Sequence, residues 1–183
     1  DYPPVFTSLS PWWKEYGVLN DYFARLSLVL SQGRQENGWL ILEPTTSLWL
    51  HYTSVSGGKP LWDIANDFQA LLGALERGQM EYDLGCEDIM ADCASVGRKC
   101  LRVGQAGYHT VVLPAKTENL ESRTFQLMRD FASSGGRIIA LGLPDYVDGE
   151  ESAELQAFMQ SDAVIKMQTP QEILSLYRQE ADL

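Results

Sequence analysis

Basic residues are scarce in this chain. Its 183 residues include 14 Lys and Arg against 25 Asp and Glu, which gives a formal net charge of −11. Nucleic acids and anionic membranes attract proteins that carry an excess of Lys and Arg. We therefore expect no nucleic-acid partner and no membrane partner, and we interpret the acidity as a contribution to solubility.

Metal-binding patterns are also missing. The chain has only two histidines, His51 and His109, and three cysteines, Cys86, Cys93 and Cys100. Zinc sites use closely spaced Cys pairs with further Cys or His ligands, and this spacing does not match them. We expect no metal and no cofactor. The cysteines are interpreted as structural thiols, with a Cys86–Cys93 or Cys93–Cys100 bridge left open.

Long apolar runs are absent too. The longest apolar stretch is shorter than the ~20 residues that a membrane helix needs. The first residues, Asp1-Tyr2-Pro3-Pro4, have neither an initiator Met nor the basic and apolar segments of a signal peptide. We therefore expect the chain to begin inside a longer protein or after processing.

The first part of the chain predicts an arm and a helix. Residues 1–11 are rich in Pro and Ser and predict an extended arm. Apolar residues then recur at helical spacing from Trp12 to Gln32, with Ser10 as the expected N-cap and Gly33 as the stop. This organisation predicts an N-terminal arm and junction helix over residues 1–36, followed by an α/β domain over residues 37–183.

The second part alternates short apolar runs with amphipathic segments. This alternation predicts an α/β fold, specifically a flavodoxin-like three-layer sandwich with a mainly parallel sheet of about five strands. A small hairpin is predicted over residues 99–108, a polar and aromatic loop over 45–59, and an acidic loop over 145–151. The predicted strands are Gly38–Pro44, Glu81–Leu84, Thr110–Pro114, Arg137–Leu141 and Ala163–Met167, and the predicted helices are Pro60–Arg77, Thr117–Ser134, Ser152–Met159 and one that starts at Pro170.

The end of the Arg137–Leu141 strand is where many α/β enzymes carry a nucleophile. Sites in open parallel sheets lie at the carboxyl ends of the strands. Here the turn contains Gly142, Leu143 and Pro144, none of which has a nucleophilic side chain. We expect no catalytic residue in this chain.

Two groups of motifs resemble a known family when they are taken together. The motifs are Pro11-Trp12-Trp13-Lys14-Glu15-Tyr16, Asp21–Ser27 and Leu42-Glu43-Pro44, then Asn66–Leu72, Tyr82–Gly85, Glu87–Met90, Val112-Leu113-Pro114 and Gly135-Gly136-Arg137. This ordered set resembles the class I glutamine-amidotransferase-like domain, close to the β-galactosidase trimerisation domain, that follows the catalytic barrel in bacterial glycoside hydrolases of the α-L-rhamnosidase and β-galactosidase kind.

The resemblance implies a non-catalytic accessory or assembly domain of a larger glycoside hydrolase. The acid and the nucleophile or base of such enzymes lie on the barrel, so no catalytic residue is transferred to this chain. The implied partners are the barrel of the same polypeptide or another subunit. The alternatives are a cysteine-dependent amidotransferase-like hydrolase and a small-molecule or sugar-binding α/β module.

Seven residues are candidates for binding. Glu43, Pro114 and Gly142 are expected at the crevice end of the sheet, where Glu43 either bonds a loop amide or contacts a ligand. The other four surround the first loop: Trp49, His51, Tyr52 and Trp62. Such aromatic rings stack on the apolar faces of sugars, but they also form contact patches between proteins, and we favour packing.

Overall fold

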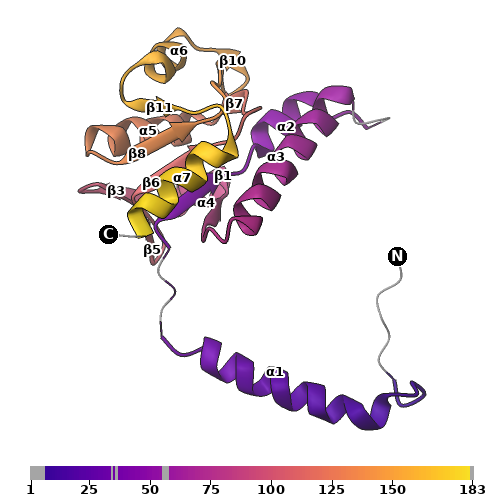
Figure 1. Cartoon of the computed structure of the whole chain (residues 1–183). Coiled ribbons are helices and arrows are strands. Elements are labelled where there is room, and N and C mark those ends of the chain that lie inside the picture. Colours follow the sequence, from indigo (N-terminus) through magenta and orange to yellow (C-terminus); the bar gives the residue numbers. More distant parts are fainter. Residues whose placement is uncertain (1–6, 34, 36, 55–57, 182–183) are drawn as a thin grey trace. The chain divides into compact units, whose positions relative to one another are not determined.

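The computed structural model describes residues 7–33, 35, 37–54 and 58–181. By its contacts the chain divides into two compact units, Asp1–Glu36 and Asn37–Leu183. Both are drawn in Figure 1. Part of the predicted extended arm, residues 1–6, lies outside the described residues. No helix of the described residues is long and apolar enough to cross a membrane.

The first unit is a helix preceded by one turn of 3-10 helix. The 3-10 turn covers Trp13–Glu15 and the helix α1 covers Tyr16–Leu30, within the predicted range. Gly33 follows with a φ of 87°, a left-handed conformation that suits glycine and ends the helix. The prediction of Ser10 as N-cap is wrong, because the 3-10 turn begins after Trp12 and the helix α1 begins after Glu15.

The second unit is built on a five-stranded parallel sheet, as the sequence predicted. Its strands run in the spatial order β11-β8-β6-β1-β2, the order of flavodoxin-like folds. All four residues of β1 and of β6 are buried, because helices cover both faces of a parallel sheet. The bounds are β1 Trp39–Leu42, β2 Asp83–Gly85, β6 Thr110–Leu113, β8 Arg137–Ala140 and β11 Val164–Lys166.

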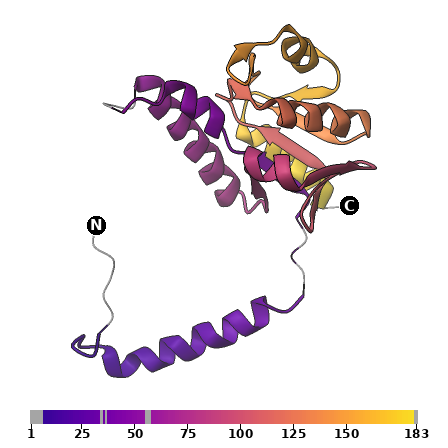
Figure 2. The same ribbon diagram turned by 180° about the vertical axis from the view of Figure 1, so that it is seen from behind.

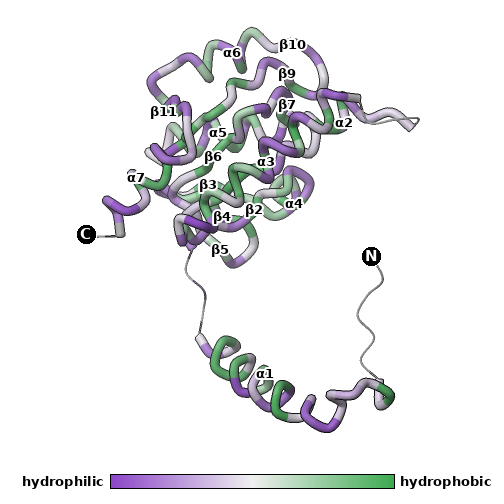
Figure 3. Tube along the Cα trace, turned by 45° about the vertical axis from the view of Figure 1, so that its right-hand side comes forward, coloured by the Kyte–Doolittle hydropathy of each residue, from purple (hydrophilic) through white to green (hydrophobic). Residues whose placement is uncertain are grey.

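Helices cover both faces of this sheet and complete three layers (Figures 1 and 2). On one face α3 (Lys59–Arg77) and α7 (Pro170–Ala181) pack on alternate strand residues such as Ile41 and Ile139. On the other face lie α4 (Glu87–Cys93), α5 (Ser122–Ser133) and α6 (Ala153–Gln160), which pack on residues such as Leu40 and Ile138. The hydropathy colouring of Figure 3 shows the central strands as largely apolar.

Two predicted loops contain regular structure. The segment predicted as a loop from Thr45 begins with the helix α2 (Thr45–His51), which is too short to show apolar periodicity. The acidic loop over 145–151 contains β9 (Tyr146–Val147) and β10 (Glu150–Glu151), an antiparallel pair. The strand β7 (Asn119–Leu120) pairs with β9, so the predicted Thr117–Ser134 helix starts only at Ser122.

A second small sheet contains the predicted hairpin. The strands β4 (Cys100–Val103) and β5 (Ala106–Tyr108) pair in antiparallel fashion, as predicted. The sequence did not reveal a third strand, β3 (Ala94–Gly97), which pairs with β4. This β3–β5 sheet lies in the connection between β2 and β6.

Candidate functional site

The strand order places the expected crevice between β1 and β6. The chain leaves β1 toward α3 on one face of the sheet and leaves β6 toward α5 on the other. Ligands of open α/β sheets bind at such a reversal, outside the carboxyl ends of the strands. The register pairs Ile41 with Val112 and, continued by two residues, brings the candidates Glu43 and Pro114 to this edge.

Helix α2 occupies this edge and bonds to the segment that follows β6. Ser47 Oγ accepts hydrogen bonds from the main-chain N–H groups of Glu118 and Asn119, at 2.9 and 3.1 Å. Ser47 is fully buried, so these two donors are satisfied by the protein rather than by a ligand. These bonds tie α2 to the segment that follows β6 across the carboxyl edge.

A buried carboxylate extends these contacts to α4 and α5. Glu87 is only 3 % exposed, and its Oε1 accepts from Thr46 Oγ1 at 2.7 Å. Its Oε2 accepts from Glu121 N at 2.8 Å, so both oxygens have a donor. Asn119 Oδ1 accepts from Gly149 N at 2.8 Å. We call Thr46, Ser47, Glu87 and Asn119 the edge network. Its hydrogen bonds join four segments of the chain, so its role is structural.

The candidate Gly142 lies where two loops touch through their backbones. A Cβ atom at this position would lie 2.1 Å from the main-chain oxygen of Ala115 and 2.7 Å from that of Pro114. Only glycine allows the loop after β8 to approach the loop after β6 so closely. The structure therefore brings the candidates Gly142 and Pro114 together, but as a closed backbone contact rather than an open pocket.

The aromatic candidates lie on the surface of α2 and α3. Trp49, Tyr52 and Trp62 are 60 %, 68 % and 59 % exposed, and Leu50 beside them is also exposed. We call these four residues the aromatic surface. The candidate His51 lies apart from it, because its Nε2 is 2.7 Å from Glu118 Oε2 in a partly buried pair.

The candidate Glu43 stays at the end of β1. It is half-buried, and its N–H donates to the main-chain oxygen of Gly85 at 2.9 Å. The candidates thus fall into a closed corner, formed by Glu43, Pro114 and Gly142, and an open aromatic surface. His51 and its partner Glu118 belong to neither.

The cysteines and histidines do not form a pair in the described part of the chain. All three cysteines are free thiols, and Cys93 is the exposed one. Cys86 follows β2 at the carboxyl edge, whereas His109 precedes β6 at the opposite edge and has its Nδ1 3.0 Å from Thr110 Oγ1. Among residues 7–33, 35, 37–54 and 58–181, no hydrogen bond joins a thiol to an imidazole.

Carboxylates gather at the start of α5. Burial, and then repulsion from Glu87, Asp88 and Asp148, raises the pKa of Glu121 above its ordinary value. Asp148 Oδ1 accepts from Ser122 N at 2.9 Å and thereby occupies the start of α5. Within the described ranges, no group of three or more His, Cys, Asp and Glu residues has an arrangement that could hold a metal ion.

Sequence reasoning missed most of the edge network. Thr46, Ser47 and Asn119 gave no periodic signal. Glu87 follows a predicted strand, and the sequence leaves two interpretations open, a residue at the carboxyl edge or a residue that opens the short helix α4. A usable signal was the polar run Thr45-Thr46-Ser47 directly after a buried strand, since buried hydroxyls require partners.

No family model matches this chain, and no curated protein matches it either.

Proposed function

We propose that this chain is a non-catalytic accessory domain of a larger glycoside hydrolase, in which it packs on the catalytic barrel of the same polypeptide. Another subunit is the alternative contact. The resemblance of the ordered motifs supports the enzyme class. The physical support comes from the N-terminal unit and from the closed edge of the sheet.

The observation that carries the proposal is the apolar surface of helix α1, which belongs to a unit of its own, Asp1–Glu36. No residue of this helix is buried. Its exposed apolar residues form a broad stripe along the helix, with Leu28 outside it: Val18, Leu19, Tyr22, Phe23, Leu26, Leu28, Val29 and Leu30. A single helix cannot form a core, and so large an apolar surface marks a contact with another structure. A junction helix that packs on a preceding barrel would be covered in this way.

The edge network supports an accessory role for the α/β domain. Active sites need groups that are free to contact a substrate. The buried polar groups at the carboxyl edge between β1 and β6 bond to other groups of the protein instead. Ser47, Glu87 and Asn119 are each less than 5 % exposed and each has protein partners. This arrangement fixes the loops to one another at the carboxyl edge.

The test uses the polypeptide encoded directly upstream of residue 1, which the proposal expects to be a catalytic barrel. This segment should co-purify with residues 1–183, and the double variant Leu19→Asp, Phe23→Asp should lose that association. Asp21→Asn, on the same helix outside the apolar stripe, is the matched control and should retain it. Residues 1–183 alone should cleave neither nitrophenyl rhamnoside nor nitrophenyl galactoside. Turnover by the pure chain, or an upstream segment without a barrel, would refute the proposal.

A sugar-binding role is a second candidate, favoured by the aromatic surface. Exposed Trp and Tyr rings are suited to stacking on the CH faces of sugars. Calorimetric titration of rhamnose and galactose oligosaccharides would test this role. Binding that is lost in Trp49→Ala and kept in Trp13→Ala would support it, and no heat with any sugar would exclude it.

A further inference from the structure

The strand β11 forms an open edge of the five-stranded sheet. Its register pairs Lys166 with Ala140, and Met167 N donates to Ala140 O at 3.0 Å. In a parallel ladder the main-chain N–H and C=O groups of one residue point to one side of the strand, and those of the next residue point to the other side. Ile165 and Met167 therefore direct their N–H groups to β8, and Lys166 directs its main-chain N–H and C=O away from the sheet.

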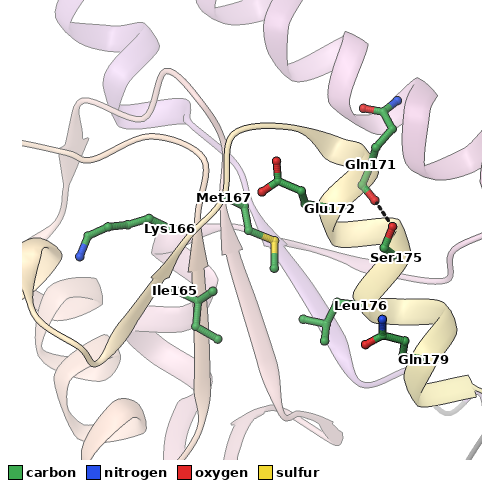
Figure 4. Close-up of a pocket in the computed structure, with 8 residues that line it drawn as sticks. All are labelled: Ile165, Lys166, Met167, Gln171, Glu172, Ser175, Leu176 and Gln179. Carbon is green, nitrogen blue, oxygen red and sulfur yellow. Dashed lines mark hydrogen bonds between the residues drawn. The ribbon is translucent and has the colours of Figure 1, made fainter.

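A groove of about 450 Å³ lies beside this edge, between β11 and α7. Ile165, Met167 and Leu176 supply its apolar side chains, and Ile165 is 42 % exposed. Gln171 and Gln179 of α7 line its other side. Figure 4 shows Ile165 and Met167 on one side of this space and Leu176 of α7 on the other, with the Lys166 side chain directed away from the helix.

The charged side chains at the groove are already held by the protein. Lys166 Nζ donates to the main-chain oxygens of Gln160 and Ser161, at 2.9 and 3.3 Å, and so caps the end of α6. Glu172 accepts from Gln168 N and from Thr169 Oγ1, at 3.2 and 3.1 Å. The groups that remain available are the outward N–H and C=O of Lys166, the apolar floor and two side-chain amides.

We propose that the groove is a peptide-binding site that takes an extended segment of another polypeptide as an added strand beside β11. Main-chain bonds at Lys166 would hold the segment, and alternate apolar side chains would enter the groove over Ile165 and Leu176. Residues 37–183 contain 11 basic and 21 acidic residues, a net charge of −10. The complementary segment therefore carries Lys or Arg beside its apolar residues.

A second copy of this chain fits the site poorly. Two α/β units of net charge −10 would repel each other. The inference is independent of the proposed accessory role, because it uses only β11, α7 and the charge of the domain.

The experiment compares two substitutions at one position. Lys166→Pro removes the outward N–H and leaves the ladder to β8 intact, since proline is tolerated on edge strands where its nitrogen faces solvent. Lys166→Ala is the matched control, because it removes the same side chain and keeps the N–H. A phage-displayed library of random octapeptides is selected on the immobilised wild-type chain, and the selected peptides are then measured on both variants.

We expect selected peptides with alternating apolar residues and Lys or Arg flanks. Their affinity for Lys166→Ala should match that for the wild type, and their affinity for Lys166→Pro should fall about ten-fold, as expected for one lost main-chain bond. Circular dichroism of both variants checks that the fold is kept. The inference is overturned by a selection without enrichment, by peptides that bind both variants equally, or by loss of binding in Lys166→Ala.

Discussion

Thr46 and Glu87 lie 41 residues apart in the sequence, and the Thr46 hydroxyl donates a 2.7 Å hydrogen bond to the Glu87 carboxylate. Both side chains are buried. The bond joins α2 to α4 across the carboxyl edge of the sheet. A buried carboxylate requires such donors, because its desolvation is otherwise not offset.

Thr46→Val should therefore destabilise the domain by about 1–3 kcal/mol, since the substitution keeps the shape and removes a donor to a buried charge. Urea unfolding measures this loss. Thr124→Val is the control, because the Thr124 hydroxyl is buried without a hydrogen-bond partner among the described residues. The control should be neutral or slightly stabilising. Equal losses in both variants would contradict this role for Thr46.

Gly142→Ala should destabilise the fold by about 3 kcal/mol or more, because the new Cβ would meet backbone atoms that have little room to move. The midpoint of thermal unfolding reports the effect. At Gly97 a Cβ would meet only Cys100 O, at 3.8 Å. Gly97→Ala should therefore leave the midpoint nearly unchanged, and a small effect at Gly142 would show that the two loops can separate.

Glu121 should make stability depend on pH. Its pKa is raised above its ordinary value of 4.5, chiefly by burial and then by three neighbouring carboxylates. The folded state thus holds this proton more tightly than the unfolded state, so its contribution to stability grows as the pH falls through the raised pKa. Glu121→Gln should be more stable than the wild type at pH 7, and the difference should shrink toward pH 4.5.

The exposed Glu150 of β10 provides the control for that experiment. Glu150→Gln removes the same charge at a position away from the carboxylates that surround Glu121. The stability of this variant should depend on pH in the same way as that of the wild type. Thermal unfolding at a series of pH values compares the three proteins. Identical curves for Glu121→Gln and Glu150→Gln would mean that the overall charge, not the local repulsion, sets the dependence.

Substitution of two tryptophans should change the free energy of unfolding by very different amounts. Trp49 belongs to the aromatic surface, so Trp49→Ala should change the free energy of unfolding by less than about 0.5 kcal/mol. Trp39 is 3 % exposed and packs edge-on against Tyr177, with ring centroids 5.9 Å apart. Trp39→Ala should cost about 3–5 kcal/mol in a denaturant titration. A large cost at Trp49 would make that ring part of the core instead.

The main elements of the fold were predictable because their signals are local. The largely β-branched run Thr110–Leu113 predicts a strand buried on both faces, and the structure confirms it. The helix α2 and the strands β7, β9 and β10 were missed, because each is too short to establish a period of its own. Pairing with distant segments determines these elements, and a single sequence does not display that pairing.

The site was predictable only in part. The expected position of Glu43, Pro114 and Gly142 at the carboxyl edge follows from strand polarity. The closure of this edge does not, because it depends on Ser47, Glu87 and Asn119 meeting from three different elements. Polar residues of this kind look like ordinary loop residues until their burial is known.

The β3–β5 sheet has a consequence for how the domain assembles. Its three strands lie within residues 94–108, whereas β1 must find its partner β6 across the whole stretch between Trp39 and Thr110. Closing short loops costs less chain entropy and happens faster than closing long ones. The β3–β5 sheet is therefore expected to form early. Its formation shortens the loop between β1 and β6 that must close before these two strands can pair.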